Sequence, residues 1–203
     1  MNLRSLPSTI PTLTLEGASS LIHQAAGRRQ GCLVVAIDGR SGSGKSTLAR
    51  KLSSLVGEST VLEGDDFFCG GTVVRSDPPS VLVSSCIDWR EQARVLSLLR
   101  QGLSASYHAF DWDRFDGSVS SDESLLTPKR VLFLEGTYSA RPELANLVDL
   151  RFVVVVDDDV RLRRLVSRDG GIGLWEKQWI DAEPYYFDVH LPKIHVDGLL
   201  SGV

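Results

Sequence analysis

The chain has 203 residues, of which 42% are hydrophobic and 24% are charged, and its formal net charge is −4. This composition is typical of a globular protein, and we expect one domain spanning 1–203 with a substantial hydrophobic core. The mild excess of acidic residues provides no basic surface for nucleic acid or anionic lipid. The longest apolar runs, 32–37 and 152–156, are far shorter than the roughly 20 residues that span a bilayer.

The cysteine content indicates a reducing compartment. Cys32, Cys69 and Cys86 show neither CxxC spacing nor an even number, so a disulfide framework or a structural zinc site is not expected. The first residues contain no continuous apolar stretch of the kind found in secretory signals. We therefore expect a soluble, cytoplasmic protein.

The predicted elements begin with an irregular arm over 1–15, which contains Pro7 and Pro11. Apolar residues at three- and four-residue spacing then predict a helix over 16–30. Gly31 follows directly, and glycine is typical of the position after a helix C-terminus.

Short runs rich in valine and isoleucine then alternate with helical patterns. Such runs are typical of strands that are buried on both faces. Four predicted strands end near Asp38, Asp65, Gly136 and Asp157, and a fifth is predicted over 193–198. The intervening helices are predicted over 46–55, 88–101, 141–147 and 159–168. This alternation predicts a three-layer α/β fold with a five-stranded parallel sheet, helices on both faces, and ligands at the carboxyl ends of the strands.

The alternation is interrupted over 69–128, and long connections in compact domains are usually functional. We expect this region to cover the substrate. Its second half mixes acidic and aromatic residues, namely Asp111, Asp113 and Asp116 with Tyr107, Phe110, Trp112 and Phe115. Acidic side chains facing a substrate would repel a phosphorylated acceptor and favour a neutral polyol, a nucleoside or an amine-bearing molecule. The alternative is a hairpin with its aromatic residues turned inward and its acidic residues in water.

The strongest motif is GRSGSGKST at 39–47, which matches the phosphate-loop pattern GxxxxGK[ST] at every fixed position. Glycines let successive backbone N–H groups surround a polyphosphate, and the N-terminus of the following helix favours the same anion. Lys45 is expected to reach the β- and γ-phosphates and the Ser46 hydroxyl to bind Mg²⁺, whereas Gly42 is expected to add only conformational freedom. The candidate nucleotide-binding residues are Gly39, Ser41, Gly42, Ser43, Gly44, Lys45, Ser46 and Thr47.

Two acidic residues at strand ends are candidates for phosphoryl-transfer chemistry. Asp65, after the second predicted strand, is placed to accept the proton of an attacking hydroxyl, although an isolated aspartate there is more often a loop or capping residue. Glu135, after the third, is a candidate Mg²⁺ ligand, with a solvated strand-end acid as the alternative. The chain contains no [NT]KxD guanine-reading motif, which argues against a GTPase switch.

The helix predicted over 159–168 places Arg161, Arg164 and Arg168 on one face. Phosphoryl transfer needs positive charge over the migrating group, so a basic helix that closes as a lid would suit it. We take 159–190 as the lid and its following helix, although a row of arginines is often only a solvated face. Farther along, Trp175 and Trp179 are expected to pack into the core, with a contact to the substrate as the alternative.

The order IDGRSGSGKST, GDDFF, FLEGTY and DVRLRRLVSRD resembles the uridine kinase family, within the uridine kinase and phosphoribulokinase group of P-loop kinases. The resemblance spans about 30–170 and implies ATP (or GTP), Mg²⁺ and transfer of the γ-phosphate to a small-molecule hydroxyl. It makes Asp65 the catalytic base and matches Asp88 to an aspartate that holds the ribose. The chain departs from the family where a Tyr-Asp-Phe segment and a histidine read the pyrimidine, because the corresponding segment here is YHAFDW at 107–112 with no later histidine before the next strand.

These observations predict a Mg²⁺-dependent kinase of a small hydroxylated molecule, with neither nucleic acid nor membrane as a partner. The expected catalytic residues are Lys45, Asp65, Arg164 and Arg168, and the expected substrate contacts are Asp65, Asp88, Tyr107 and Asp111. The resemblance also raises a homo-oligomer as an expectation. Two alternatives stay open: a kinase of an antibiotic or another specialised metabolite, and a nucleotide-dependent regulator that transfers no phosphate.

Overall fold

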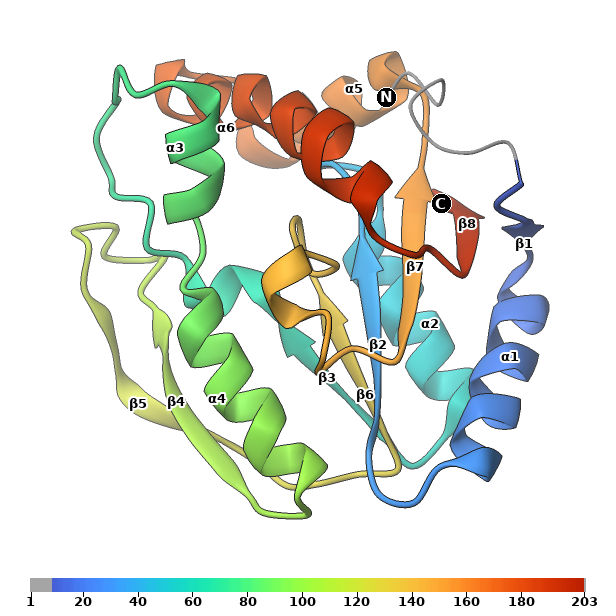
Figure 1. The fold of residues 1–203 in the computed structure, drawn as a ribbon. Coiled ribbons are helices and arrows are strands. Elements are labelled where there is room, and N and C mark those ends of the chain that lie inside the picture. The colour runs from blue at the N-terminus through green and yellow to red at the C-terminus, as the bar shows by residue number, and fades with distance from the viewer. Residues whose placement is uncertain (1–8, 203) are drawn as a thin grey trace.

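The computed structural model describes residues 9–202 and contains a parallel sheet between two helical layers (Figure 1). The strands follow the spatial order β1-β8-β7-β2-β6-β3, and every neighbouring pair is parallel. Their bounds are β1 Thr12–Leu13, β2 Leu33–Asp38, β3 Ser59–Glu63, β6 Val131–Glu135, β7 Leu150–Val155 and β8 Gly198–Ser201. The predicted fold class is confirmed, but the sheet has six strands rather than five because β1 adds a two-residue edge.

The predicted arm over 1–15 is therefore partly ordered structure. Thr12 and Leu13 pair with Leu199 and Leu200 of β8, and helix α1 (Leu15–Arg28) begins directly afterwards. The Thr14 side chain caps α1 by accepting a hydrogen bond from the Gly17 N–H. The first eight residues of the predicted arm lie outside the described part of the chain.

Two other predicted boundaries are wrong. The strand predicted over 193–198 begins only at Gly198, because the chain first completes a 3₁₀ turn at Leu191–Lys193, where Pro192 fixes a helical φ. The helix predicted over 141–147 is a single 3₁₀ turn at Pro142–Leu144. It cannot extend further because the chain must reach Asp149, whose N–H donates to the Val34 carbonyl and aligns β7 with β2.

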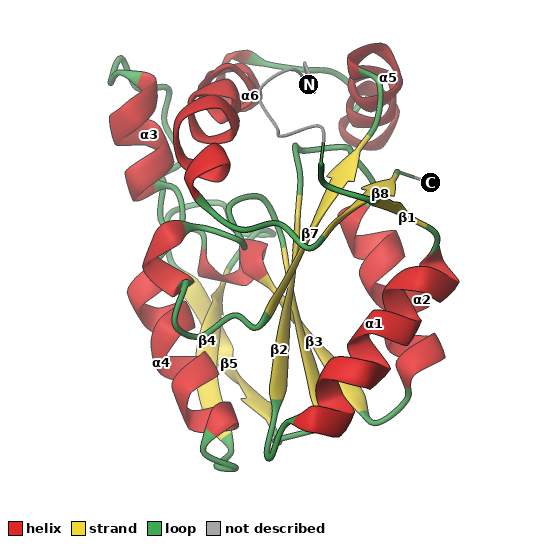
Figure 2. Cartoon of the chain, turned by 45° about the vertical axis from the view of Figure 1, so that its right-hand side comes forward, coloured by secondary structure: helices red, strands yellow, loops and turns green. Residues whose placement is uncertain are grey.

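Each face of the sheet has its own hydrophobic core (Figure 2). Helices α1 and α2 (Lys45–Val56) cover one face, where Ile22 and Leu52 are fully buried. Helix α4 (Trp89–Arg100) covers the other face through Val95 and Leu96. Parallel strands sandwiched in this way must be apolar throughout, which explains the uninterrupted hydrophobic runs in the sequence.

The interrupting region is more regular than the sequence indicated. It contains helix α3 (Pro79–Ser85) and an antiparallel hairpin of β4 (Ala105–Phe110) and β5 (Val119–Leu126). The hairpin lies beside α4 (Figure 1). Helices α5 (Asp158–Asp169) and α6 (Leu174–Tyr185) lie with α3 above the carboxyl ends of the strands. Helices α3, α5 and α6 thus gather at the carboxyl end of the sheet, whereas the hairpin runs along its side (Figure 1).

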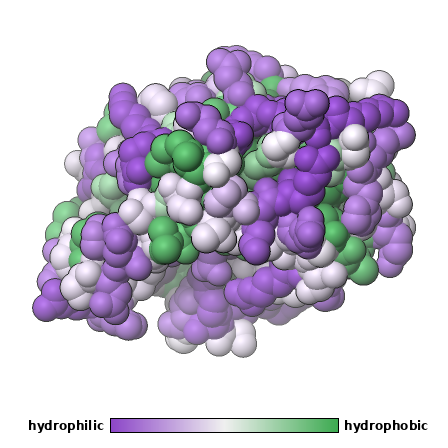
Figure 3. All heavy atoms as spheres, turned by 90° about the horizontal axis from the view of Figure 1, so that it is seen from below, coloured by the Kyte–Doolittle hydropathy of each residue, from purple (hydrophilic) through white to green (hydrophobic). Residues whose placement is uncertain are grey.

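The opposite end of the molecule carries a mainly hydrophilic surface with scattered hydrophobic residues (Figure 3). This end holds the amino ends of the strands, so the view shows the side away from the phosphate loop. Among the helices of residues 9–202, none combines the length and hydrophobicity that a membrane crossing requires.

Candidate active site at the phosphate loop

The phosphate loop connects β2 directly to α2, as its motif predicted. Gly39 has φ +148°, and a Cβ there would lie 2.7 Å from the Val154 carbonyl oxygen. Gly44 has φ +94° and forms the N-cap of α2, whose first residue is Lys45. These two glycines therefore let the loop turn tightly above β7 and point the amino end of α2 into it.

Gly42 does more than add conformational freedom, so that expectation is corrected. A Cβ at Gly42 would lie 2.7 Å from the Arg161 carbonyl oxygen and 2.9 Å from Leu165 Cγ. Helix α5 rests on the loop at this point. A side chain here would push the two elements apart, which means that the glycine sets the distance between the phosphate loop and α5.

Lys45 is buried at the base of the loop and points away from bulk solvent. Its Nζ atom donates to the Arg40 carbonyl and to Thr137 Oγ1, each at 3.2 Å. Both partners are uncharged, so the ammonium is available to the oxygens of an incoming polyphosphate. In this structure these hydrogen bonds connect Lys45 to the backbone of the phosphate loop and to the residue after Gly136.

Glu135 is buried beside this loop and lies near the Ser46 hydroxyl. Desolvation raises the pKa of Glu135 to about 7, against the opposing effects of the positive charge on Lys45 and of the Ser46 hydroxyl, which lower it. A buried carboxylate next to a hydroxyl is a donor set that suits a small divalent cation, which also takes phosphate oxygens and water. The residues present therefore fit Mg²⁺.

Asp65 is brought close to Glu135 by two glycines at neighbouring strand ends. Glu63 pairs with Glu135 in the β3–β6 register, and Gly64 and Gly136 come next in each chain segment. A Cβ on Gly64 would lie 2.8 Å from the Glu135 carbonyl oxygen, and one on Gly136 would lie 3.1 Å from the Gly64 Cα. The negative charge of Asp65 contributes to the raised pKa of Glu135, as expected of neighbouring carboxylates.

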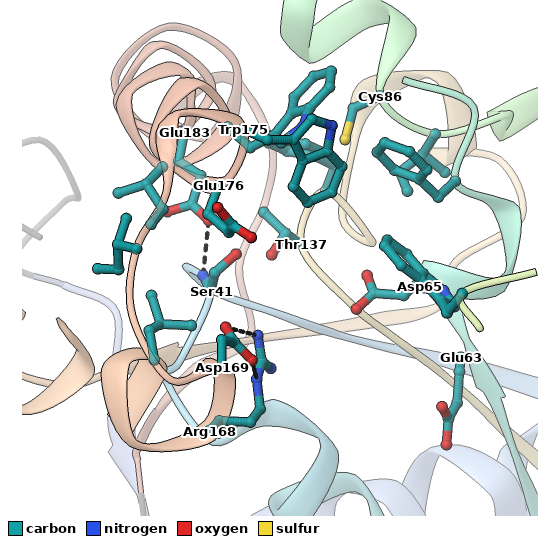
Figure 4. A pocket seen from close by; sticks show the side chains of 18 of the residues that line it. Ser41, Glu63, Asp65, Cys86, Thr137, Arg168, Asp169, Trp175, Glu176 and Glu183 are labelled. Atoms are coloured by element: carbon teal, nitrogen blue, oxygen red, sulfur yellow. Dashed lines mark hydrogen bonds and ion pairs between the residues drawn. The ribbon is translucent and has the colours of Figure 1, made fainter. Parts of the chain in front are cut away.

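A cavity of about 640 Å³ lies between the phosphate loop and the interrupting region (Figure 4). Ser41 and Thr137 line it on the loop side and Asp65 lines it from the end of β3. Helices α5 and α6 close the remaining walls with residues that include Arg168, Trp175 and Glu183. A hydroxyl bound here would lie between Asp65 and the phosphate loop.

Of the four substrate residues predicted from the sequence, one lines the cavity and three do not. Asp65 lines the cavity, whereas Asp88, Tyr107 and Asp111 do not. Asp88 caps α4 by accepting hydrogen bonds from the N–H groups of Arg90 and Glu91, and Asp111 accepts one from the Arg114 N–H. These side chains fit the local structural roles that aspartates commonly take at helix and turn starts.

Tyr107 instead fastens the hairpin to the end of β3. Its hydroxyl donates to Asp66 at 2.7 Å and its ring stacks on Phe67 with centroids 4.8 Å apart. Burial raises the pKa of Asp66, although the hydrogen bond from Tyr107 opposes this shift. The pair therefore positions the segment that carries Asp65.

Tyr107 and Phe110 of the hairpin turn inward, as the alternative interpretation of this segment predicted, whereas Trp112 is 43% exposed. Phe110 is buried and meets Phe68 at 5.0 Å, while Trp112 and Phe115 reach the cavity wall. Trp179 is buried in the core on the α4 side and Trp175 packs against it, as predicted. Both tryptophans also line the cavity, which the core interpretation did not foresee.

The three lid arginines occupy different environments. Arg161 is buried and contacts Asp158 at 3.0 Å and the Ser41 carbonyl at 3.2 Å, so it fixes α5 to the loop. Arg164 donates to the Ser43 carbonyl at 3.4 Å. Arg168 lines the cavity, and its exposed guanidinium pairs with Asp169 at 2.6 Å (Figure 4). Arg168 is therefore the one of the three that faces the cavity.

Two buried acids of the site were missed by sequence reasoning. Asp38 accepts hydrogen bonds from the N–H groups of Gly39, Tyr138 and Ala140 and from the Tyr186 hydroxyl. Burial raises the pKa of Asp38, and the hydrogen bonds from Tyr186 and Ala140 lower it. An aspartate inside an apolar run just before the phosphate loop was a usable signal for this residue.

Glu183 left no such signal because its partners in the phosphate loop are about 140 residues away in the chain. Its carboxylate accepts hydrogen bonds from the Ser41 N–H at 2.9 Å and from Arg40 at 3.1 Å, and it lies 3.7 Å from Arg161. Glu183 is 1% exposed. It connects α6 to both the phosphate loop and α5.

Comparisons with known proteins relate this chain to kinases. The model of the Phosphoribulokinase / Uridine kinase family matches residues 79–171. A uridine kinase of Halobacterium salinarum is 29% identical over 140 residues, which cover 66% of this chain and 61% of that protein. The chain thus aligns with about three fifths of that relative's length.

Solved structures share the fold at low sequence identity. A putative fructose transport system kinase from Silicibacter sp. has a TM-score of 0.64 at 21% identity, covering 93% of this chain and 98% of that one. A D-glycerate 3-kinase from Cryptococcus neoformans also has a TM-score of 0.64, at 12% identity, covering 92% and 95% of the two chains.

The fold and the phosphate-loop motif match those of P-loop kinase structures. More particularly, the sequence is similar to those of uridine kinases, which are 29% and 27% identical over about two thirds of this chain, as the sequence motifs had indicated.

Proposed function

We propose that this protein transfers the γ-phosphate of ATP, with Mg²⁺, to a hydroxyl group of a small molecule held in the 640 Å³ cavity. The observation that carries the proposal is that Lys45, Ser46 and Asp65 all lie close enough to Glu135 to shift its pKa, while Asp65 also lines that cavity. Each of these residues supplies one requirement of phosphoryl transfer, and none of them is needed for the stability of a parallel sheet.

Positioning and charge neutralisation are the main tasks of the protein in this reaction. The backbone N–H groups of 39–47 and the amino end of α2 bind the phosphates, and Lys45 neutralises them. Ser46 and Glu135 would hold Mg²⁺, which when bound offsets the negative charge of the triphosphate. GTP is the alternative donor.

Asp65 orients the acceptor hydroxyl and accepts its proton as the new P–O bond forms. A carboxylate at this place suits the task because it lines the cavity and lies near Glu135. Arg168 and Arg164 approach the transferring group from α5. Arg168 exchanges its ion pair with Asp169 for the phosphate when the nucleotide is bound.

The acceptor is proposed only as a class, a hydroxylated small molecule. A nucleoside is one candidate because the curated relatives are uridine kinases. An antibiotic or another specialised metabolite is a second candidate, since Asp88 and Asp111 are engaged in caps and turns. A regulator that binds nucleotide without transfer is disfavoured because it would need neither Asp65 nor Glu135.

The test is acceptor-dependent ADP release by the purified protein with ATP, Mg²⁺ and a panel of nucleosides, sugars and amino alcohols. A kinase releases ADP with some acceptors and yields a phosphorylated product. Tight nucleotide binding without any phosphorylated product would contradict the proposal and favour the regulator.

A further inference from the structure

Five aromatic side chains form one wall of the active-site cavity. Phe68, from the end of β3, meets Trp112 at 5.1 Å and Trp175 at 5.7 Å between ring centroids. Phe115 meets Trp175 at 4.9 Å, and Trp175 meets Trp179 at 6.2 Å. All five line the cavity. Because they come from three separate parts of the chain, their convergence is a property of this site rather than of one helix.

This aromatic wall is partly open rather than sealed within the core. Trp112 is 43% exposed although it touches three other rings of the cluster. The Trp175 indole N–H donates to the Gly71 carbonyl at 2.9 Å, which satisfies its polar atom and holds the ring in place. Indole faces presented in this way are available to a ligand.

The remaining cavity wall is rich in acidic side chains, of which Glu183 and Asp169 are ion-paired with arginines. The acidic lining residues are Glu63, Asp65, Asp66, Asp169, Glu176 and Glu183, whereas Arg168 is the one lysine or arginine that lines this cavity. Arg168 is itself paired with Asp169. Glu176, on the same helix as Trp175, forms no ion pair within residues 9–202, and its carboxylate accepts a hydrogen bond from the Gly173 N–H.

We propose that the acceptor is an organic cation, a hydroxylated molecule bearing an ammonium or quaternary ammonium group that sits against Trp112 and Trp175 with Glu176 beside it. This proposal rests on the proposed function and names the substrate class for the same site. A cation over an indole face is attracted by the ring's quadrupole, and a nearby carboxylate adds to the attraction. The hydroxyl of the acceptor then extends along the cavity toward Asp65.

The same cavity walls are expected to disfavour negatively charged acceptors. A carboxylated or phosphorylated acceptor would meet several carboxylates in a confined space and one arginine that is already paired. A neutral acceptor would gain the aromatic contacts without the electrostatic attraction. The preference is therefore expected to follow the charge of the acceptor more than its size.

Binding of charge-matched pairs tests the proposal without requiring turnover. Choline and 3,3-dimethylbutan-1-ol have the same shape but differ in charge, and D-glucosamine and D-glucose differ mainly by an ammonium group. Calorimetry and the quenching of tryptophan fluorescence would give the dissociation constants. We expect the cation of each pair to bind at least about tenfold more tightly, with the advantage shrinking as salt is added. Equal binding within both pairs, or no measurable binding of either cation, would overturn the proposal.

Single substitutions test whether Glu176 and Trp112 are responsible for the preference for cations. Glu176→Gln keeps an acceptor for the Gly173 N–H and removes the charge, and Trp112→Leu removes a ring from an exposed position. Both should reduce the preference for the cation by several fold or more. Asp181→Asn is the matched control because Asp181 lies on the same helix, exposed and paired with Lys177. An unchanged preference in Glu176→Gln and Trp112→Leu, with circular dichroism showing folded protein, would overturn the assignment.

The failure of this inference is distinguishable from failure of the proposed function. Phosphorylation of neutral acceptors as fast as of their cationic twins would remove the inference and leave the kinase. Selective binding of cations with no phosphorylated product from any acceptor would retain the inference and remove the kinase.

Discussion

The carboxylate of Glu183 accepts a hydrogen bond from the backbone N–H of Ser41 at 2.9 Å, across 142 residues of sequence. Ser41 is the third residue of the phosphate loop, and Glu183 lies near the end of α6. Because Glu183 also contacts Arg40 and Arg161, one buried acid holds the loop, α5 and α6 together. The cavity between these elements depends on that arrangement.

Glu183→Gln should therefore lower the stability of the whole protein. Glutamine retains an acceptor for the Ser41 N–H but removes the buried charge beside Arg40 and Arg161, which keep Asp158 as an ion-pair partner. The loss is expected to be about 1–3 kcal/mol. Urea unfolding of the two proteins at neutral pH measures the difference. Asp181→Asn, on the exposed side of the same helix, should change stability by less than about 0.5 kcal/mol. Equal losses in the two variants would contradict this role of Glu183.

Lys45→Ala should abolish phosphoryl transfer. Lys45 is the lysine of the phosphate loop, and its partners in the free protein are the Arg40 carbonyl and the Thr137 hydroxyl. Losing a charge that stabilises the transition state is expected to reduce the rate by at least about 10²-fold. Lys51→Ala, which alters an exposed lysine on the same helix, is the control and should keep the wild-type rate. A variant at Lys45 that retains most of its activity would remove it from the phosphate site.

Glu135→Gln should stabilise the free protein at alkaline pH while removing Mg²⁺-dependent activity. The pKa of Glu135 is raised to about 7 by burial, whereas the carboxyl of an unfolded chain titrates near 4.5. Between these values the unfolded state ionises first, so rising pH favours unfolding of the wild type. The glutamine variant lacks this penalty, which is on the order of 3 kcal/mol once pH exceeds 7.

Melting temperatures of wild type and Glu135→Gln at pH 5 and pH 8, without nucleotide or Mg²⁺, check this prediction. The melting temperature of the variant relative to that of the wild type should rise by several degrees between pH 5 and pH 8. A gap that does not change with pH would show that Glu135 titrates like an exposed acid.

Arg168→Ala should slow transfer with little effect on stability. The guanidinium of Arg168 is largely exposed, lines the cavity and is paired only with its neighbour Asp169 among the charged residues 9–202. Its removal should lower kcat by about 10-fold or more, as expected for a positive charge over the migrating phosphate. Arg163→Ala, an exposed arginine on the same helix, should leave kcat unchanged. Equal rates for both variants would make Arg168 a surface residue.

The sequence predicted best what depends on local patterns. The strand, loop and helix around 39–47 were recognisable because the phosphate loop needs a fixed spacing of glycines and lysine. The apolar strands were recognisable because a parallel sheet covered on both faces leaves no polar alternation. The strand predicted over 193–198 was misplaced because a proline-containing turn at Leu191–Lys193 precedes the short strand at Gly198–Ser201.

Long-range features could not be read in the same way. Nothing near Glu183 indicates that it meets Ser41, and nothing near Gly42 indicates that α5 rests on it. Asp88 and Tyr107 were chosen from a resemblance and from composition, whereas their geometry shows a helix cap and an anchor for the hairpin. The residues of the aromatic wall are likewise separated in the sequence, with Phe68 after β3 and the others in the hairpin and α6, so only the fold could bring them together.

The most direct test of the proposed kinase is the transfer of labelled phosphate from [γ-³²P]ATP to small hydroxylated acceptors by wild-type protein and by Asp65→Asn. The proposal predicts a labelled small-molecule product from the wild type, a rate reduced by about 10²- to 10⁴-fold in Asp65→Asn, and unchanged ATP binding in that variant. Asp122→Asn, an exposed change on β5, should transfer phosphate normally. Equal labelling by wild type and Asp65→Asn, or ATP binding with no labelled product from any acceptor, would contradict it.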